Sequence, residues 1–226
     1  MTHILSSNSE VIGFGESKTV YHSKNDFDSL SKEIHWNLRK GKIFGSQMLI
    51  DSVLMNHLLP NPDLLKTKPL YAIFLVREPN KAIPSIFNMG VSHWNCDPNR
   101  YEKEALKYYL DRLSSLEKYA KIINSKSHGF FLTYEQLVSQ TELVFEKLQN
   151  FLELKSPLSE NYQLTPATGK SGKGDWTDNI KSSRIIKNAR SSGSGINLSQ
   201  ETLDRGREGF KHCCNLLSQY CRTVDD

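Results

Sequence analysis

One unbroken apolar run dominates the hydrophobic pattern of the chain. Residues 70–76, Leu-Tyr-Ala-Ile-Phe-Leu-Val, are rich in β-favouring side chains and too few for an ordinary helix. We therefore expect a strand buried on both faces, the kind found in parallel sheets. Arg77 follows at once, then a proline turn and a second amphipathic segment. This order places Arg77 at the carboxyl end of a central strand, the edge where open α/β sheets bind ligands.

The remaining apolar residues predict alternating helices and strands. Helical spacing, caps and breakers predict helices over residues 2–9, 26–39, 51–59, 82–90, 102–124, 135–151 and 203–220. Short β-favouring runs predict further strands over residues 43–50 and 130–134, and a short strand or an extended turn over residues 11–16. Strand and helix in alternation are typical of right-handed crossovers over a parallel sheet. The expected fold is α/β, a three-layer sandwich with a central parallel sheet.

Length and composition favour one ordinary globular domain over residues 1–226. The chain has 226 residues, of which 38% are hydrophobic and 24% charged, enough for a substantial core. No apolar run reaches the roughly 18 residues that cross a bilayer, and the first residues do not form a signal peptide. A cytoplasmic protein without a transmembrane segment is expected. The domain starts at the end of a helix, so we also expect that something precedes Met1.

Cysteine and histidine spacing predicts neither disulfides nor a metal site. The net charge of +4 comes from one segment, because residues 165–195 hold six cations and two acids. Gly, Ser and Lys dominate residues 167–196, which we interpret as a basic lid loop. A confined cationic loop suits a small phosphorylated ligand, whereas nucleic-acid binders more often spread basic and aromatic residues over a whole face.

Arg77 and Ser85 have the spacing of an anion clamp. Ser85 lies eight positions after Arg77, about two helical turns into the next segment, so both side chains could reach one phosphate. The plainer alternative for Arg77 is a salt bridge with Glu78 or another acid at the strand end. Pro84 weakens the expectation of a regular helix here, because it removes a backbone donor.

Two motifs resemble those of sulfotransferases that use 3′-phosphoadenylyl sulfate (PAPS). The first is the strand, Arg-x-Pro and helix serine that include Arg77 and Ser85. The second is Leu-Thr-Tyr-Glu-Gln-Leu at residues 132–137. The chain is most similar to the bacterial members of the carbohydrate and tyrosylprotein-like branch. This resemblance implies a fold like that of P-loop nucleoside triphosphate hydrolases, a 3′-phosphate held by Arg77 and Ser85, and an adenine that contacts Tyr134.

The same resemblance assigns roles to two further segments. It implies that residues 169–176 fold over the nucleotide and offer Lys170 or Lys173 to the 3′-phosphate; the alternative is a solvated loop. It also implies that Glu16 is the base that takes the acceptor proton, although without the family Glu16 would be interpreted as a solvated turn carboxylate. His57 is the rival base by analogy with cytosolic members, but it lacks their Lys-x-His context.

The chain departs from the family at its start. Family members open with a strand and an Arg-Ser-Gly-Thr-Thr-Leu type of loop that holds the 5′-phosphosulfate, and no such loop stands before Thr2. The alternatives are a wrong start codon, a fragment and a true loss of the loop. We favour truncation of the sequence over true loss.

The sequence is compatible with three functions. The first is a sulfotransferase that moves a sulfuryl group from PAPS to a hydroxyl of a sugar, a tyrosine or a small alcohol, without a metal. The second is an inactive protein that binds 3′,5′-phosphoadenosine, and the third is a relative of nucleotide kinases. Trp94 and Trp176 could stack on a sugar or on adenine, although packing is the plainer interpretation of both.

Overall fold

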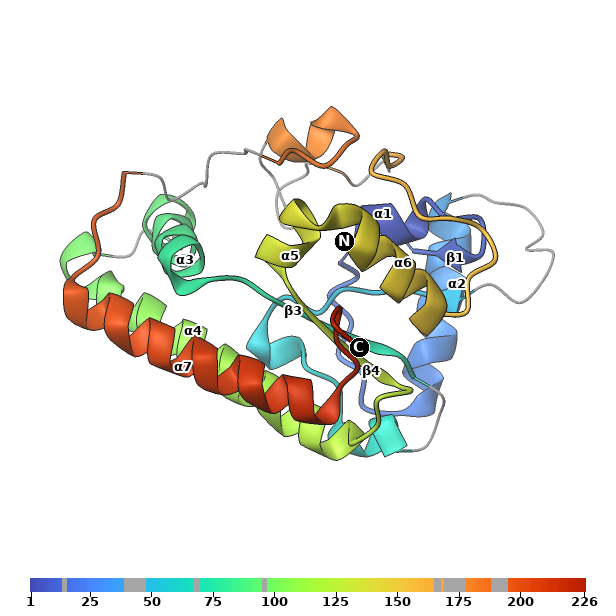
Figure 1. The fold of residues 1–226 in the computed structure, drawn as a ribbon, viewed down its shortest axis with the longest axis horizontal. Helices are drawn as coiled ribbons and strands as arrows, with labels where there is room; N and C mark the ends of the chain where they lie inside the picture. Colours follow the sequence, from blue (N-terminus) through green and yellow to red (C-terminus); the bar gives the residue numbers. More distant parts are fainter. Residues whose placement is uncertain are drawn as a thin grey trace. The chain divides into compact units, whose positions relative to one another are not determined.

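The computed structural model describes residues 1–13, 16–38, 48–66, 70–94, 97–164, 168, 178–187 and 195–226. Within these residues the chain forms seven α-helices and two parallel two-stranded sheets (Figure 1). The prediction of an α/β fold with parallel strands is confirmed at this level, and the three-layer sandwich stays a prediction. The chain divides into two compact units, Met1–Pro69 with Thr141–Lys187, and Leu70–Gln140 with Asn188–Asp226.

The first unit is built on a short parallel pair. Strand β1 (Val11–Ile12) pairs with β2 (Met48–Leu49), and helix α2 (Lys24–Leu38) lies between them in sequence. The unit also contains α1 (Thr2–Ser6), α6 (Thr141–Phe151) and the 3-10 helices Asn56–Leu58, Pro62–Lys66 and Asp178–Ser182. One apolar cluster joins the β1 strand to α2 and the segments around it: Ile12, Tyr21, Leu30, Ile34 and Leu64.

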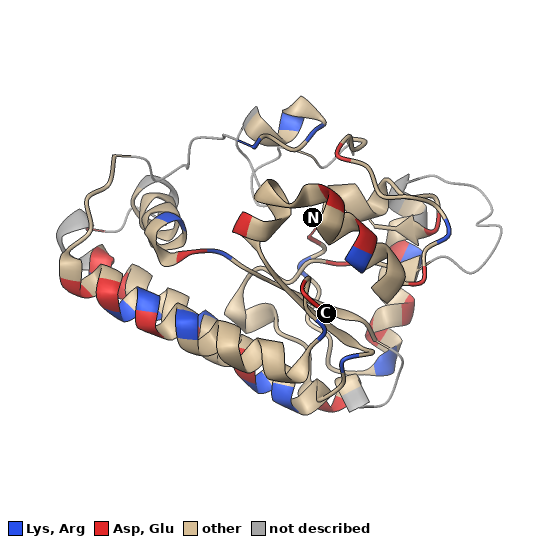
Figure 2. Ribbon diagram, viewed as in Figure 1, with Lys and Arg blue, Asp and Glu red and all other residues tan. Residues whose placement is uncertain are grey.

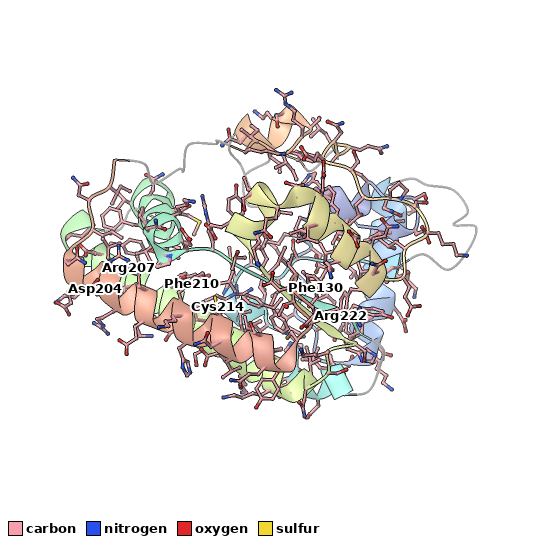
Figure 3. The ribbon with its side chains drawn as sticks, in the orientation of Figure 1. Phe130, Asp204, Arg207, Phe210, Cys214 and Arg222 are labelled. Carbon is pink, nitrogen blue, oxygen red and sulfur yellow. The ribbon has the colours of Figure 1, made fainter. Side chains whose placement is uncertain are left out.

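The second unit is a complete βαβ arrangement. Strand β3 (Ala72–Val76) pairs in parallel with β4 (Gly129–Thr133), from Ala72 opposite Gly129 to Val76 opposite Thr133. Two helices, α3 (Pro79–Trp94) and α4 (Pro98–Ile123), connect these strands. The chain then enters α5 (Tyr134–Ser139), and Arg222 near the carboxyl terminus forms a parallel bridge to Phe130 on β4 (Figure 3).

Helix α7 (Gln200–Tyr220) runs beside α4 and in the same direction (Figure 1). At its start the Ser199 hydroxyl donates to Glu102 at 2.6 Å, and further along the Cys213 thiol contacts the Leu113 carbonyl. Phe74, Val76 and Phe131 of the sheet share one core with residues of α3, α4 and α7. The helices that follow β3 therefore pack together around the carboxyl end of that strand.

Three predicted features are wrong in detail. The helix expected over residues 51–59 is reduced to the 3-10 turn Asn56–Leu58, because Asp51 bonds to Ser17 and Tyr21 instead of starting a helix. The helix expected over residues 135–151 breaks at Gln140, whose backbone leaves the helical region. The strand expected to be buried on both faces leaves Leu75 37% exposed.

Most of the predicted lid lies outside the described residues. The undescribed residues of the lid include Lys170, Lys173 and Trp176. Residues 43–47 of the strand expected over 43–50 also lie outside the described residues. Within the part of the chain that the structure describes, no helix is both long and apolar enough to cross a membrane.

Candidate functional site

The parallel register of the second unit brings two predicted site residues together. Val76 and Thr133 are opposite each other in the last register pair, so the residues that follow them, Arg77 and Tyr134, both leave the sheet at its carboxyl edge. The Cζ atom of Arg77 lies over the Tyr134 ring, 4.7 Å from its centroid. This distance is typical of a cation–π contact. The two motifs, which are 57 residues apart in sequence, therefore meet at one place.

The Arg77 guanidinium retains hydrogen-bonding capacity. Within the described residues its buried Nε atom has no hydrogen-bond partner, and no carboxylate among them lies within ion-pair distance of it. The salt bridge with Glu78, which was the plainer interpretation of Arg77, is not formed. A buried donor without a partner is costly, by about 1–3 kcal/mol. An anion that accepted this N–H would remove that cost.

A capping box fixes the position of Tyr134. Thr133 is the N-cap of α5, and its Oγ1 accepts from the Gln136 N–H at 3.1 Å. In return the Gln136 side-chain oxygen accepts from the Thr133 N–H at 3.0 Å. These reciprocal bonds satisfy two donors at the start of the helix. The local sequence Thr-Tyr-Glu-Gln therefore fixes the start of α5 and with it the position of Tyr134, the first residue of that helix.

The start of α3 is held just as firmly. The Glu78 carbonyl accepts from the N–H groups of Lys81 and Ala82, and Pro79 occupies the first helical position, where proline is tolerated. The Tyr109 hydroxyl donates to the Arg77 carbonyl at 2.8 Å. Burial is the main cause that raises the pKa of Tyr109 well above its ordinary value. The hydroxyl is therefore a neutral donor that anchors the strand end to α4.

Glu135 links the two strand ends. Its Oε2 accepts from the Glu78 N–H at 3.3 Å, and its Oε1 lies 3.6 Å from the Lys81 ammonium. The same Oε1 atom is buried and has no hydrogen-bond partner in the described part of the chain. The carboxylate therefore occupies the beginning of α3, where the helix dipole favours negative charge.

Ser85 lies on α3 and is half-buried. It follows the first helical residue, Pro79, by six positions, or about 9 Å along the helix axis. An anion that contacts both Arg77 and Ser85 must therefore lie along the first two turns of α3. Pro84 is inside the helix but does not end it, so the doubt that this proline raised about a regular helix is not borne out.

Glu16 belongs to the first unit and is buried, with 3% of its surface exposed. Among the residues that the structure describes, its Oε1 has no hydrogen-bond partner. Because Glu16 is buried, it is not the solvated turn carboxylate of the plainer interpretation. The next residue, Ser17, donates to Asp51 through its backbone and its hydroxyl, at 2.9 and 2.6 Å. Tyr21 also donates to Asp51, at 2.5 Å, and burial raises its pKa. His57, the rival base, is exposed on its 3-10 turn.

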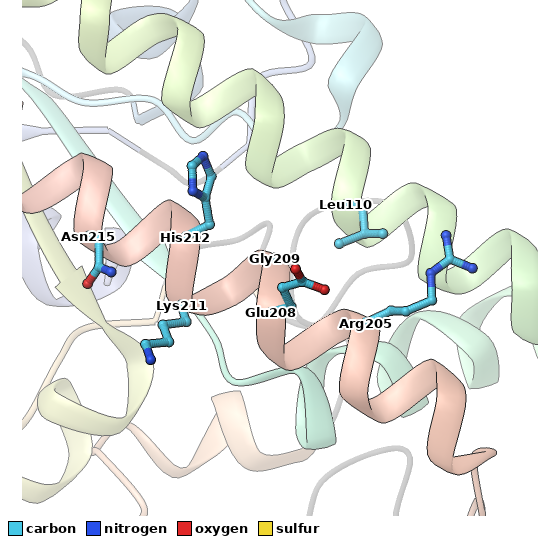
Figure 4. A pocket seen from close by; sticks show the side chains of 7 residues that line it. All are labelled: Leu110, Arg205, Glu208, Gly209, Lys211, His212 and Asn215. Atoms are coloured by element: carbon cyan, nitrogen blue, oxygen red, sulfur yellow. The ribbon is translucent and has the colours of Figure 1, made fainter.

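A shallow groove between α4 and α7 is a separate feature (Figure 4). It is lined by Leu110, Arg205, Glu208, Gly209, Lys211, His212 and Asn215. His212 points toward α4, where it lies 3.7 Å from Glu117, whereas Lys211 points away. Figure 2 shows charges of both signs interspersed along α7. The groove contains none of the predicted site residues, and its mixed charges do not select one class of ligand.

Within the described residues, no three His, Cys, Asp or Glu side chains gather closely enough to hold a metal ion. Comparisons with protein-family models, curated proteins and solved structures found no match to the chain. The functional proposal therefore depends on the residues themselves and on the geometry of each unit.

The sequence patterns missed two members of the cluster at the strand edge. Tyr109 reads in sequence as an ordinary aromatic of a long helix, and nothing local indicates that its hydroxyl reaches the end of β3. Glu135 lies inside the Leu-Thr-Tyr-Glu-Gln-Leu motif, but its partners, Glu78 and Lys81, are more than 50 residues away. Only the strand pairing brings Glu135 to these partners, and only the packing of α4 brings Tyr109 to Arg77.

Proposed function

We propose that this chain binds a 3′-phosphorylated adenosine nucleotide at the carboxyl edge of β3 and β4, and that it is a PAPS-dependent sulfotransferase. The observation that carries the proposal is the Arg77 side chain, with an unpaired buried N–H and its guanidinium over Tyr134. When a guanidinium stacks on an aromatic ring, its N–H groups, which lie in its own plane, remain available to bind a phosphate. Tyr134 supplies an aromatic surface beside it for the base.

The proposed roles follow the family resemblance. Arg77 and Ser85 bind the 3′-phosphate, Tyr134 contacts the adenine, and Lys170 or Lys173 adds a cation from the basic loop. In the transfer step the acceptor hydroxyl oxygen forms a bond to the sulfur of PAPS as the bond from sulfur to the 5′-phosphate oxygen breaks. Glu16 accepts the hydroxyl proton, and adenosine 3′,5′-bisphosphate leaves. Cations that stabilise charge on the leaving phosphate and precise positioning supply most of the catalysis, as in phosphoryl transfer.

Calorimetric titration with adenosine 3′,5′-bisphosphate tests the nucleotide site. We expect binding by the unaltered chain, weaker binding of AMP because it lacks the 3′-phosphate, and a loss of at least tenfold in bisphosphate affinity for Arg77→Ala. Arg205→Ala is the matched control, since this arginine lies in an exposed pair on α7. Bisphosphate affinity that Arg77→Ala leaves unchanged would overturn the proposal.

Turnover separates catalysis from binding alone. Transfer of labelled sulfate from PAPS to a panel of sugar, tyrosine and alcohol acceptors, abolished by Glu16→Gln with bisphosphate affinity retained, is the result expected of an enzyme. Bisphosphate binding without transfer to any acceptor indicates the inactive phosphoadenosine-binding protein. Preference for ATP over the bisphosphate indicates the relative of nucleotide kinases.

A further inference from the structure

Lys81 lies between the two residues assigned to the 3′-phosphate. It is four positions after Arg77 and four before Ser85, and it belongs to the first turn of α3. Helix positions four apart share one face, so Lys81 and Ser85 face the same side. An anion held by Arg77 and Ser85 along these two turns must therefore pass the Lys81 side chain.

The Lys81 ammonium is positioned but not committed to its partner. It lies 3.6 Å from Oε1 of Glu135, and 44% of its side chain is exposed. A pair this exposed is held weakly, and the distance exceeds that of a hydrogen bond. The Glu135 carboxylate, which follows Tyr134 directly, draws the ammonium toward the strand edge where the Arg77 guanidinium lies.

We propose that Lys81 is a third ligand of the 3′-phosphate and makes the site selective for 3′-phosphorylated nucleotides. The inference rests on the proposed function, because it assigns a further residue to the same nucleotide site. The ammonium exchanges Glu135 for the phosphate, which carries more charge and offers more acceptor oxygens. Three donors of different kinds, a guanidinium, an ammonium and a hydroxyl, then surround one dianion.

Glu135 is the positioning residue in this arrangement. Its Oε2 accepts from the Glu78 N–H at the start of α3, and its Oε1 has no hydrogen bond to any residue that the structure describes. As an anion at the same edge it also competes with the phosphate for Lys81. Glu135→Gln keeps the side-chain shape and an oxygen that can accept from Glu78, but removes the competing charge. Bisphosphate affinity is therefore expected to rise severalfold.

The test is calorimetric titration of the full chain with adenosine 3′,5′-bisphosphate and with AMP. Lys81→Ala is expected to weaken bisphosphate binding about tenfold and to leave AMP binding within twofold of the unaltered chain. Lys81→Arg, which keeps the charge, is expected to recover most of the bisphosphate affinity. Lys107→Ala is the matched control, because this lysine pairs with Asp111 on the exposed side of α4, and it should change neither affinity. Circular dichroism establishes that each variant is folded.

Two results would overturn the inference and leave the proposed function standing. One is a loss of bisphosphate affinity in Arg77→Ala without a loss in Lys81→Ala. The other is an equal loss for bisphosphate and AMP in Lys81→Ala, which would indicate general attraction and not a 3′-phosphate contact. Bisphosphate binding that neither Arg77→Ala nor Lys81→Ala alters would instead refute the proposed nucleotide site itself.

Discussion

Replacing Tyr109 by phenylalanine isolates one hydrogen bond that holds the end of β3. The tyrosine is 5% exposed, and its hydroxyl donates to the Arg77 carbonyl at 2.8 Å. Phenylalanine keeps the ring and its packing, so the change creates no large cavity and removes only the donor. The Arg77 carbonyl, which is partly buried, is left with less hydrogen bonding than before.

The expected loss in the free energy of unfolding is about 1 kcal/mol, the usual net value of one such bond when solvent reaches the acceptor in part. With a urea m value of about 2 kcal/mol per molar, the unfolding midpoint falls by about 0.5 M. Urea unfolding followed by circular dichroism measures this shift, and an unchanged m value shows that the transition keeps its character. Loosening of the strand end should also weaken bisphosphate binding by Arg77.

Tyr220→Phe is the matched control for this change. Tyr220 packs against the same core from α7, and its hydroxyl has no hydrogen bond among the described residues. Its midpoint should stay close to that of the unaltered chain. If Tyr109→Phe unfolded at the same urea concentration as Tyr220→Phe, the anchoring role of the Tyr109 hydroxyl would be wrong.

Three further changes test other parts of the second unit. Thr133→Ala removes the capping box and should cost about 1 kcal/mol in urea unfolding, whereas Thr133→Ser should restore most of that loss. Bonds from Ser199 lower the pKa of Glu102 below its ordinary value of 4.5. Glu102→Gln should therefore destabilise the chain at neutral pH, and the difference should disappear as the pH falls through the lowered pKa; a difference that persisted in strong acid would contradict this. Gly90→Ala places a Cβ atom 1.8 Å from the Tyr101 ring, so a loss of about 1–3 kcal/mol is expected in thermal or urea unfolding, and an unchanged stability would show that α3 and α4 shift freely.

The local sequence around the strand edge determines much of the proposed site. An apolar run that stops at Arg77, with proline two residues later, already predicts a strand end followed by a helix. The order Thr-Tyr-Glu-Gln is also a local signal, because a threonine and a glutamine three positions apart can bond to each other's backbone N–H groups, as the capping box of α5 shows. Such signals are readable because the atoms involved are close in sequence.

Local patterns failed where distant residues compete for the same side chain. Asp51 was expected to begin a helix, but Ser17 and Tyr21 donate to its carboxylate, and no helix forms before the turn at Asn56–Leu58. The exposure of Leu75 likewise depends on residues that are distant in sequence. An apolar run predicts burial on both faces, but what covers each face depends on elements that are remote in sequence.

The amino-acid sequence alone thus determined the two strands of the second unit and the approximate places of most helices, and it suggested the residues of the proposed phosphate site. Tertiary structure alone decided that Arg77 meets the Tyr134 ring, that Tyr109 anchors the strand end and that Glu135 faces Lys81. The physical reason is that a local pattern specifies each strand and helix, whereas only the register of β3 with β4 and the packing of α4 bring side chains that are distant in sequence into contact.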